Sequence, residues 1–212
     1  GIKVNPDELE KLSNKFGEEL MDLTKNIYNM ANAKFNINSP KQLGEILFEH
    51  LSLPVIKRTK TGYSTDAEVL EKLREHHPIV EYILEYRSLT KLKSTYADGI
   101  LALVNKNTNR IYTSFNQTVT STGRISSTEP NLQNIPVRTE VGRHIRGVFT
   151  ADDPEHVLLS GDYSQIELRV LAHISQDPGL IAAFTDGEDI HTRTASEVFE
   201  VPLEEVTPSL RD

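Results

Sequence analysis

The sequence contains no cysteine among its 212 residues and has no long apolar run. Without cysteine there are no disulfide bonds and no thiolate ligands, so any bound metal must use oxygen or imidazole ligands. No apolar stretch approaches the roughly 18 residues that cross a bilayer, and the N-terminus lacks the ordered segments of a secretory signal peptide. These absences predict a soluble, intracellular protein and allow a reducing compartment.

Basic residues are fewer than acidic ones: the sequence has 23 Lys and Arg and 31 Asp and Glu, which gives a net charge of -8. Over the whole chain this deficit argues against nucleic acid, since proteins that neutralise phosphates usually have a basic excess. The charge is uneven, however. Residues 1–85 have 11 basic and 14 acidic side chains, residues 86–150 have 9 and 3, and residues 151–212 have 3 and 14. A basic middle segment therefore precedes an acidic end.

The composition, with 37% hydrophobic and 25% charged residues, is that of one globular domain or two small ones. Apolar residues recur at spacings of three and four over residues 6–30, which predicts an amphipathic helix. Asn5 is its expected N-cap, with Glu8 placed for a capping arrangement. Ser39 and Pro40 repeat this logic at the start of a second helix.

Two further helices are expected, one from Thr65 and one after Pro78. Residues 54–64, which are rich in Lys, Arg, Thr and Gly, predict an exposed loop. We therefore expect residues 1–97 to form a helical unit without a strand.

Short β-prone runs appear in the second half of the chain, at residues 110–113, 145–150 and 157–159. Residues 120–136 lie between them and are rich in Ser, Thr, Asn and Pro. A polar loop of this length inside a compact chain is more often functional than idle. The pattern predicts an α+β fold with a functional loop held by polar contacts.

The sharpest local signal is VLLSGDYSQIELR at residues 157–169. An apolar strand is expected to place Asp162 at its C-terminal end, where open sheets tend to hold ligands, and oxygen ligands suit Mg²⁺. Ser164 is expected to cap the following helix, with Glu167 completing a capping box. Two interpretations stay open: Asp162 binds metal or only satisfies backbone donors, and Glu167 acts in a site or only caps the helix.

Basic and amide side chains suggest contacts with nucleic acid. Arg87, Lys91 and Ser94 are spaced to lie on one helix face, where they could follow a phosphate backbone, although a solvated face is the alternative. Four residues of the polar loop can donate to the acceptors that every base pair presents in the minor groove, or can simply hold the loop together. They are Arg124, Asn131, Gln133 and Asn134.

His191 follows Asp189 near an expected helix start, where backbone N–H groups favour anions. A helix cap or a packed side chain is the alternative for this histidine.

Several sequence blocks resemble the family A DNA polymerases, the DNA polymerase I family. DYSQIELR resembles the family's motif A, and the other blocks resemble its thumb, palm loop and fingers, in the family's order. The blocks are YR at 86–87, KLKSTY at 91–96, FNQT at 115–118, TGRISS at 122–127, PNLQNIP at 130–136, DYSQIELR at 162–169 and DIHT at 189–192.

The resemblance implies a helical thumb over residues 1–97, the N-terminal part of an antiparallel palm sheet over residues 98–186, and the first fingers helices over residues 187–212. It implies a DNA-directed DNA polymerase of replication and repair, which transfers a nucleotide from a dNTP to a primer 3′-hydroxyl with two Mg²⁺ ions. The implied partners are primer-template DNA, a dNTP and the remaining fingers and palm, and the implied location is the bacterial cytoplasm at the nucleoid, with no membrane.

Residue roles follow from the same resemblance. Asp162 and Glu167 would be catalytic, and Asp162 would bind both ions together with the backbone carbonyl of Tyr163. The nucleotide would contact Gln165, Glu167, His191 and Arg211. The DNA would contact Arg87, Lys91, Ser94, Asn116, Arg124, Asn131, Gln133 and Asn134.

Two elements of the family's active site do not occur in the sequence: the fingers lysine that follows an arginine such as Arg211, and the second metal-binding carboxylate. We therefore expect a fragment of a longer protein that is inactive alone. An incomplete palm sheet would also expose edge strands and apolar surface, so we expect poor solubility or self-association. The alternative is a non-catalytic module that binds primer-template DNA. A purely structural domain fits poorly with an intact block around Asp162.

Overall fold

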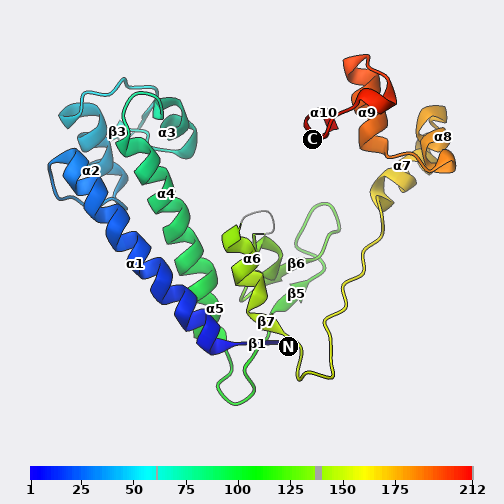
Figure 1. Cartoon of the computed structure of the whole chain (residues 1–212), viewed down its shortest axis with the longest axis horizontal. Helices are drawn as coiled ribbons and strands as arrows, with labels where there is room; N and C mark the ends of the chain where they lie inside the picture. The colour runs from blue at the N-terminus through cyan, green and yellow to red at the C-terminus, as the bar shows by residue number, and fades with distance from the viewer. Residues whose placement is uncertain (61, 137–139, 212) are drawn as a thin grey trace. The chain divides into compact units, whose positions relative to one another are not determined.

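The computed structural model describes residues 1–60, 62–136 and 140–211 (Figure 1). The chain divides into two compact units, Gly1–Leu158 and Leu159–Asp212, here called the first and the second unit. Helices predominate, and the short strands pair antiparallel, so the α+β expectation is confirmed. None of the helices in the described ranges is both long and apolar enough to cross a membrane.

The longest helix of the first unit, α1 (Pro6–Ala31), begins as predicted. The Asn5 side chain accepts a hydrogen bond from the Glu8 N–H at 3.3 Å, and Pro6 occupies the first turn, where a missing N–H costs nothing. Apolar residues spaced by three and four form the buried face. They are Leu9, Phe16, Leu23, Ile27 and Ala31.

Beyond α1, the chain builds a small cap from α2 (Pro40–Gly44), the π-helical η1 (Glu45–His50) and α3 (Ala67–Leu73). Ser39 caps α2 through the Gln42 N–H, as predicted. Helix α3 was predicted to start at Thr65 but begins at Ala67, because the Asp66 carboxylate accepts the Val69 N–H at 2.9 Å and caps the helix.

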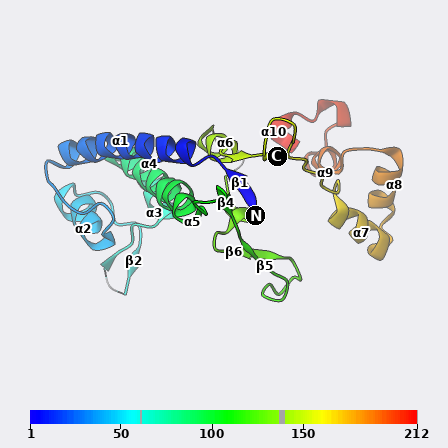
Figure 2. The same cartoon turned by 90° about the horizontal axis from the view of Figure 1, so that it is seen from below.

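Helix α4 (Ile79–Leu92) packs lengthwise on α1 and continues through the π-helical η2 (Lys93–Asp98) into α5 (Gly99–Leu103). Figure 1 and Figure 2 both show α1 and α4 side by side. One apolar cluster of their interface comprises Phe16, Leu23, Leu89 and Ala97.

A three-stranded sheet closes the base of the first unit and corrects the expectation of a strand-free N-terminus. Strand β1 (Ile2–Val4) pairs antiparallel with β4 (Arg110–Ile111) on one side and with β7 (Phe149–Thr150) on the other. The predicted loop over residues 54–64 also contains paired strands, β2 (Arg58–Thr59) and β3 (Gly62–Tyr63). These pairings join residues far apart or are too short to show a period, so local patterns did not indicate them.

The polar loop follows β5 (Ser114–Asn116), which pairs with β6 (Ser126–Thr128) and leads to the 3₁₀ turn η3 (Leu132–Asn134). Helix α6 (Glu140–Gly147) covers half of the strand predicted over residues 145–150, whose last two residues do form a strand, β7. Ile145 is fully buried on the apolar side of α6, which explains why an apolar run there was mistaken for a strand.

Over residues 159–211, which the structure describes, the second unit has five short helical segments: α7 (Ile166–Ser175), α8 (Pro178–Asp186), α9 (Ile190–Phe199), η4 (Leu203–Glu205) and α10 (Pro208–Arg211). The strand predicted over residues 157–159 is wrong, because that segment has no regular structure and Leu159 is 94% exposed. The buried apolar side chains of this unit are Ala172, Ala183, Ile190 and Ala195.

Candidate functional site

The polar loop is organised around Ser127, which is only 1% exposed. Its hydroxyl lies 2.7 Å from Thr113 Oγ1, accepts the Leu132 N–H at 3.2 Å and lies 3.1 Å from the Pro130 carbonyl. A buried hydroxyl with several partners fixes the segments that it joins, because losing it leaves those partners unpaired. Polar contacts therefore hold this loop, as predicted.

Amide side chains of the loop also contact the loop itself. Asn131 Oδ1 accepts the Gln133 N–H at 3.0 Å, and Gln133 Nε2 donates to the Ile125 carbonyl at 2.9 Å. Asn116 Nδ2 donates to Thr128 Oγ1 at 3.2 Å across the β5–β6 pair. These bonds agree with the loop-holding alternative.

Exposure leaves room for a second role, because an amide or guanidinium at the surface has more donors than one bond uses. Asn131, Gln133, Asn134 and Arg124 are all exposed. The backbone carbonyl of Arg124 accepts a bond from Thr120 Oγ1 at 2.5 Å, which fixes the backbone at that position.

The structure brings Lys91 of α4 together with Asn131 and Asn134 of the loop. The three residues line one cavity of about 370 Å³, whose wall also includes Thr95, Tyr96, Ile100 and Pro130. Lys91 is exposed. An exposed cation beside two exposed amides can bind a phosphate and a neighbouring base or sugar.

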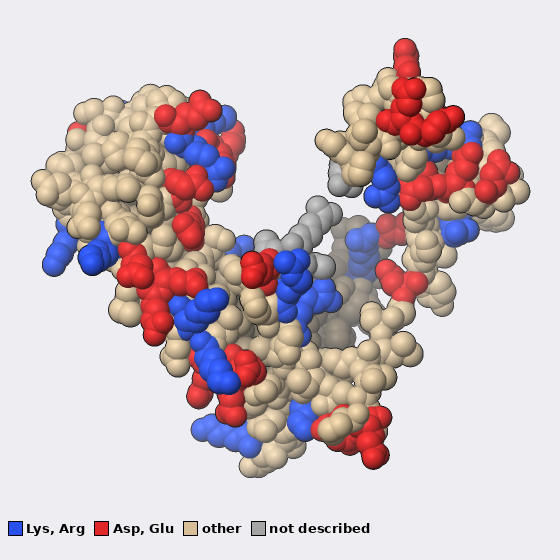
Figure 3. Space-filling model, viewed as in Figure 1, with Lys and Arg blue, Asp and Glu red and all other residues tan. Residues whose placement is uncertain are grey.

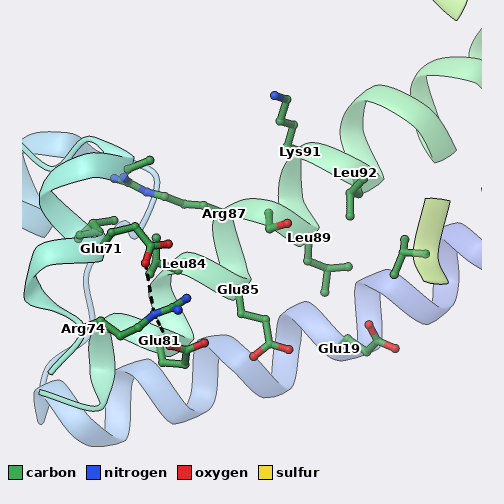
Figure 4. Close-up of a pocket in the computed structure, with 14 residues that line it drawn as sticks. Glu19, Glu71, Arg74, Glu81, Leu84, Glu85, Arg87, Leu89, Lys91 and Leu92 are labelled. Carbon is green, nitrogen blue, oxygen red and sulfur yellow. Dashed lines mark ion pairs between the residues drawn. The ribbon is translucent and has the colours of Figure 1, made fainter. Parts of the chain in front are cut away.

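Arg87 differs from Lys91 although both lie on α4. Its guanidinium donates to the Thr65 carbonyl and to Thr65 Oγ1, the latter at 3.1 Å, and burial lowers its pKa below the ordinary value. Figure 4 shows Arg87 extending toward α3 while Lys91 leaves α4 in another direction. Ser94 is exposed, and its hydroxyl lies 3.4 Å from the Lys91 carbonyl.

Arg87 also lines a groove of about 650 Å³ between α1, α3 and α4 (Figure 4). In this groove Arg74 pairs with Glu71 at 3.4 Å and with Glu81 at 2.8 Å. Glu19 and Glu85 add negative charge to its lining, and Lys91 adds a further positive charge. The lining therefore has mixed charge, with four carboxylates and three cationic side chains.

The candidate metal ligands Asp162 and Tyr163 lie in the second unit, on an exposed segment before α7. The predicted capping box is wrong. The N-cap of α7 is Gln165, in a left-handed conformation with φ 51°, and it makes no side-chain capping bond. Glu167 lies in the first turn of α7 and is exposed. Arg169 donates to the Ser164 carbonyl at 3.1 Å and so ties this segment to the helix.

The candidate nucleotide contacts His191 and Arg211 lie near one helix start. Asp189 caps α9 by accepting the Thr192 N–H at 2.9 Å, and Arg211 pairs with the Asp189 carboxylate at 3.1 Å. The Arg211 hydrogen bond and the Thr192 N–H hold the pKa of Asp189 well below its usual range. His191 is exposed in the first turn of α9, so the predicted helix start is confirmed.

Metal ligands are not clustered over the part of the chain that the structure describes: it has no group of three or more His, Asp and Glu residues that could hold an ion. Asp162 and the Tyr163 carbonyl supply oxygen donors, the type that Mg²⁺ prefers. The donor set therefore fits Mg²⁺ in kind but provides one carboxylate only.

The two units differ in net charge. The first unit has 20 basic and 20 acidic residues, whereas the second has 3 and 11. Figure 3 shows acidic side chains predominating over the helices of the second unit. The whole net charge of -8 therefore resides in the second unit, and the first is not acidic on balance.

These features define an α+β protein with a helical pair, a polar loop and a strongly acidic second unit. Residues 6–212 match DNA polymerase family A, and the chain belongs to that family.

Across 211 residues the chain is 55% identical to DNA polymerase I of Geobacillus stearothermophilus, covering all of this chain and 24% of that protein. It is 53% identical over 213 residues to the thermostable DNA polymerase I of Thermus aquaticus, covering 26% of that protein. The chain thus spans about a quarter of the length of these relatives.

A solved structure is also similar: the POL domain of Pol1 from M. smegmatis, in complex with DNA primer-template and dNTP. It matches with a TM-score of 0.86 and 47% sequence identity, over all of this chain and 37% of that one.

Sequence reasoning missed Tyr96 and Ser127 as organising residues, although both lie in the quoted blocks. Ser127 resembles any loop serine until its burial is known. Tyr96 is buried, and its only signal in the sequence was its hydroxyl, which needs a partner when the ring is buried.

Proposed function

We propose that this chain is part of a DNA-directed DNA polymerase and that its first unit binds the primer-template duplex. The observation that carries the proposal is the cavity at which Lys91, Asn131 and Asn134 meet. Lysine supplies a phosphate contact, and the amides supply donors that read no particular base, which a templated polymerase requires. The similar M. smegmatis domain, solved with DNA primer-template and dNTP, supports this assignment.

Within this proposal, residues 1–97 are the thumb, residues 98–186 the N-terminal part of the palm, and residues 187–212 the start of the fingers. Lys91 is the favoured phosphate contact of α4. The bonds from Arg87 to Thr65 support a structural role for Arg87, which is to fix the segment before α3. The guanidinium N–H groups that do not bond Thr65 would contact the DNA. The proposed location is the bacterial cytoplasm at the nucleoid, where the substrate lies.

In the second unit, we assign the catalytic metal ligands to Asp162 and the Tyr163 carbonyl, and nucleotide contacts to Gln165, Glu167, His191 and Arg211. When bound, Mg²⁺ would lower the pKa of the primer 3′-hydroxyl and neutralise the triphosphate charge. Arg211 now pairs with Asp189, so a nucleotide phosphate would compete with that carboxylate for the guanidinium.

We further propose that residues 1–212 do not polymerise alone, because two-metal chemistry needs a second carboxylate beside Asp162. The test is complementation. The purified chain is assayed for templated dNTP incorporation with and without a polypeptide carrying the remaining fingers and palm of a family A polymerase. Incorporation is expected only in the mixture, and Asp162→Ala should abolish it.

Two outcomes contradict this account. Incorporation by the chain alone that Asp162→Ala removes would refute the need for the missing part. Binding of primer-template without incorporation in any mixture would favour a non-catalytic DNA-binding module, which the better packed first unit would serve by itself.

A further inference from the structure

Tyr96 joins the helix after α4 to the polar loop. Its ring is 6% exposed, and its hydroxyl donates to the backbone carbonyl of Asn134, 38 residues further along the chain. A buried tyrosine hydroxyl normally finds a partner, and this bond satisfies both groups. This one hydrogen bond therefore holds the end of the loop, at Asn134, against the helix that carries Tyr96.

The helix side of this link is itself held in place. Tyr96 lies in η2, where the helix widens to π geometry, an arrangement that is frequent at functional sites. Lys93 Nζ donates to Ser13 Oγ of α1 at 2.7 Å and to the Asp98 carboxylate at 2.8 Å. This network anchors η2 to α1, so Tyr96 presents its hydroxyl from a fixed support.

The link lies at the proposed DNA contact. Tyr96 lines the same cavity as Lys91, Asn131 and Asn134. Lys91 stands on the helix side, whereas both asparagines stand on the loop side. We propose that Tyr96 is a positioning residue whose hydroxyl holds residues 131–134 at the distance from Lys91 at which both sides contact one duplex. This inference rests on the proposed function.

The test compares two tyrosines that make the same kind of bond. Tyr96→Phe removes the donor to Asn134, and Tyr28→Phe removes a matched donor to the Phe35 carbonyl, 2.7 Å away near the C-terminal end of α1. Primer-template affinity of the whole chain is measured by fluorescence anisotropy. We expect about a 3- to 10-fold loss of affinity for Tyr96→Phe, the value of one hydrogen bond, and less than about a twofold change for Tyr28→Phe, because only Tyr96 lines the proposed DNA contact.

Salt dependence separates positioning from simple destabilisation. If Tyr96 keeps Lys91 and the loop on one duplex, Tyr96→Phe should flatten the plot of log affinity against log salt by up to about 0.9, the value of one phosphate contact. Combining it with Lys91→Ala should cost less than the sum of the single losses, because the two residues then act on one contact. Additive losses with an unchanged slope would overturn the inference.

A donor-restoring replacement guards against misfolding. Tyr96→4-aminophenylalanine keeps a donor at the ring end and should recover most of the affinity, whereas no recovery would overturn the inference. If the unsubstituted chain binds no duplex, both the proposed function and the inference about Tyr96 are refuted. If it binds, and Tyr96→Phe binds as well as Tyr28→Phe, only the inference fails.

Discussion

The two compact units bury different kinds of side chain. The first encloses large apolar residues that are fully inaccessible, such as Phe16, Leu47 and Ile83. The second buries mainly alanines and leaves Ile174 and Val198 more than half exposed, at 75% and 68%. Since burial of large apolar side chains is the main favourable term in folding, the first unit has the stronger source of stability.

The same contrast appears at the candidate site. In the first unit, buried groups such as Ser127 and Tyr96 set the positions of exposed, chemically useful side chains. In the second unit, Asp162 lies on an exposed segment without regular structure, which the Arg169 bond to the Ser164 carbonyl joins to α7. Resemblance identifies candidate residues equally in both units, but the structure supplies their support mainly in the first.

The largest expected effect is a difference in unfolding free energy between matched Ile→Ala variants in the two units. Ile27→Ala, at a fully buried position, should lower the free energy of unfolding of the first unit by about 2–5 kcal/mol, because it leaves a cavity. The matched change Ile174→Ala in the second unit should cost less than about 0.5 kcal/mol. Urea unfolding followed by circular dichroism measures both. Equal losses would refute the contrast in burial.

A smaller effect tests the support of the polar loop. Ser127→Ala should cost about 1–3 kcal/mol, since it leaves the Leu132 N–H without its acceptor in a buried place. Ser121→Ala, at an exposed position of the same loop, serves as the control and should change the unfolding free energy little. If both variants unfold alike in urea, Ser127 does not organise the loop.

The smallest effect compares two helix caps by their pH dependence. Hydrogen bonds from the Val69 N–H, Ser64 and Lys57 lower the pKa of Asp66 to about 2. A carboxyl whose pKa is lower in the folded state stabilises the fold above its unfolded pKa, and loses that contribution as pH falls through the folded value. The melting temperatures of Asp66→Asn and the unsubstituted chain should therefore converge between about pH 4 and pH 2.

Asp189→Asn provides the counterpart in the second unit, where Arg211 and the Thr192 N–H lower the pKa of Asp189. Its melting curve should also approach that of the unsubstituted chain as pH falls. A difference that stays constant down to pH 2 for either variant would show that the carboxylate charge does not contribute.

Features set by neighbouring residues could be predicted from the sequence. The caps at Asn5 and Ser39 depend on groups three residues away, and each is found as predicted. Strand β1 could not be predicted, because three residues hold too little pattern and their partners lie far along the chain. The strand before Asp162 was predicted from its apolar run, yet in this structure that run is exposed.

The residues of the candidate site could be predicted from the sequence, but their tertiary contacts could not. Lys91, Asn131 and Asn134 were predicted separately, and the fold brings them to one cavity. For Arg87, spacing on the helix face indicated a phosphate contact but could not show that Thr65 occupies two of its donors. Long-range partners of this kind depend on tertiary packing, which no local pattern contains.

The central claim, that the first unit binds primer-template DNA through Lys91 and the polar loop, is tested most directly by affinity measured across a range of salt. The account predicts salt-sensitive binding by the unsubstituted chain, with a slope that Lys91→Ala flattens by about 0.9 and that Lys25→Ala, an exposed lysine of α1, leaves unchanged. An affinity that does not change with salt concentration, or equal slopes for all three proteins, would contradict it.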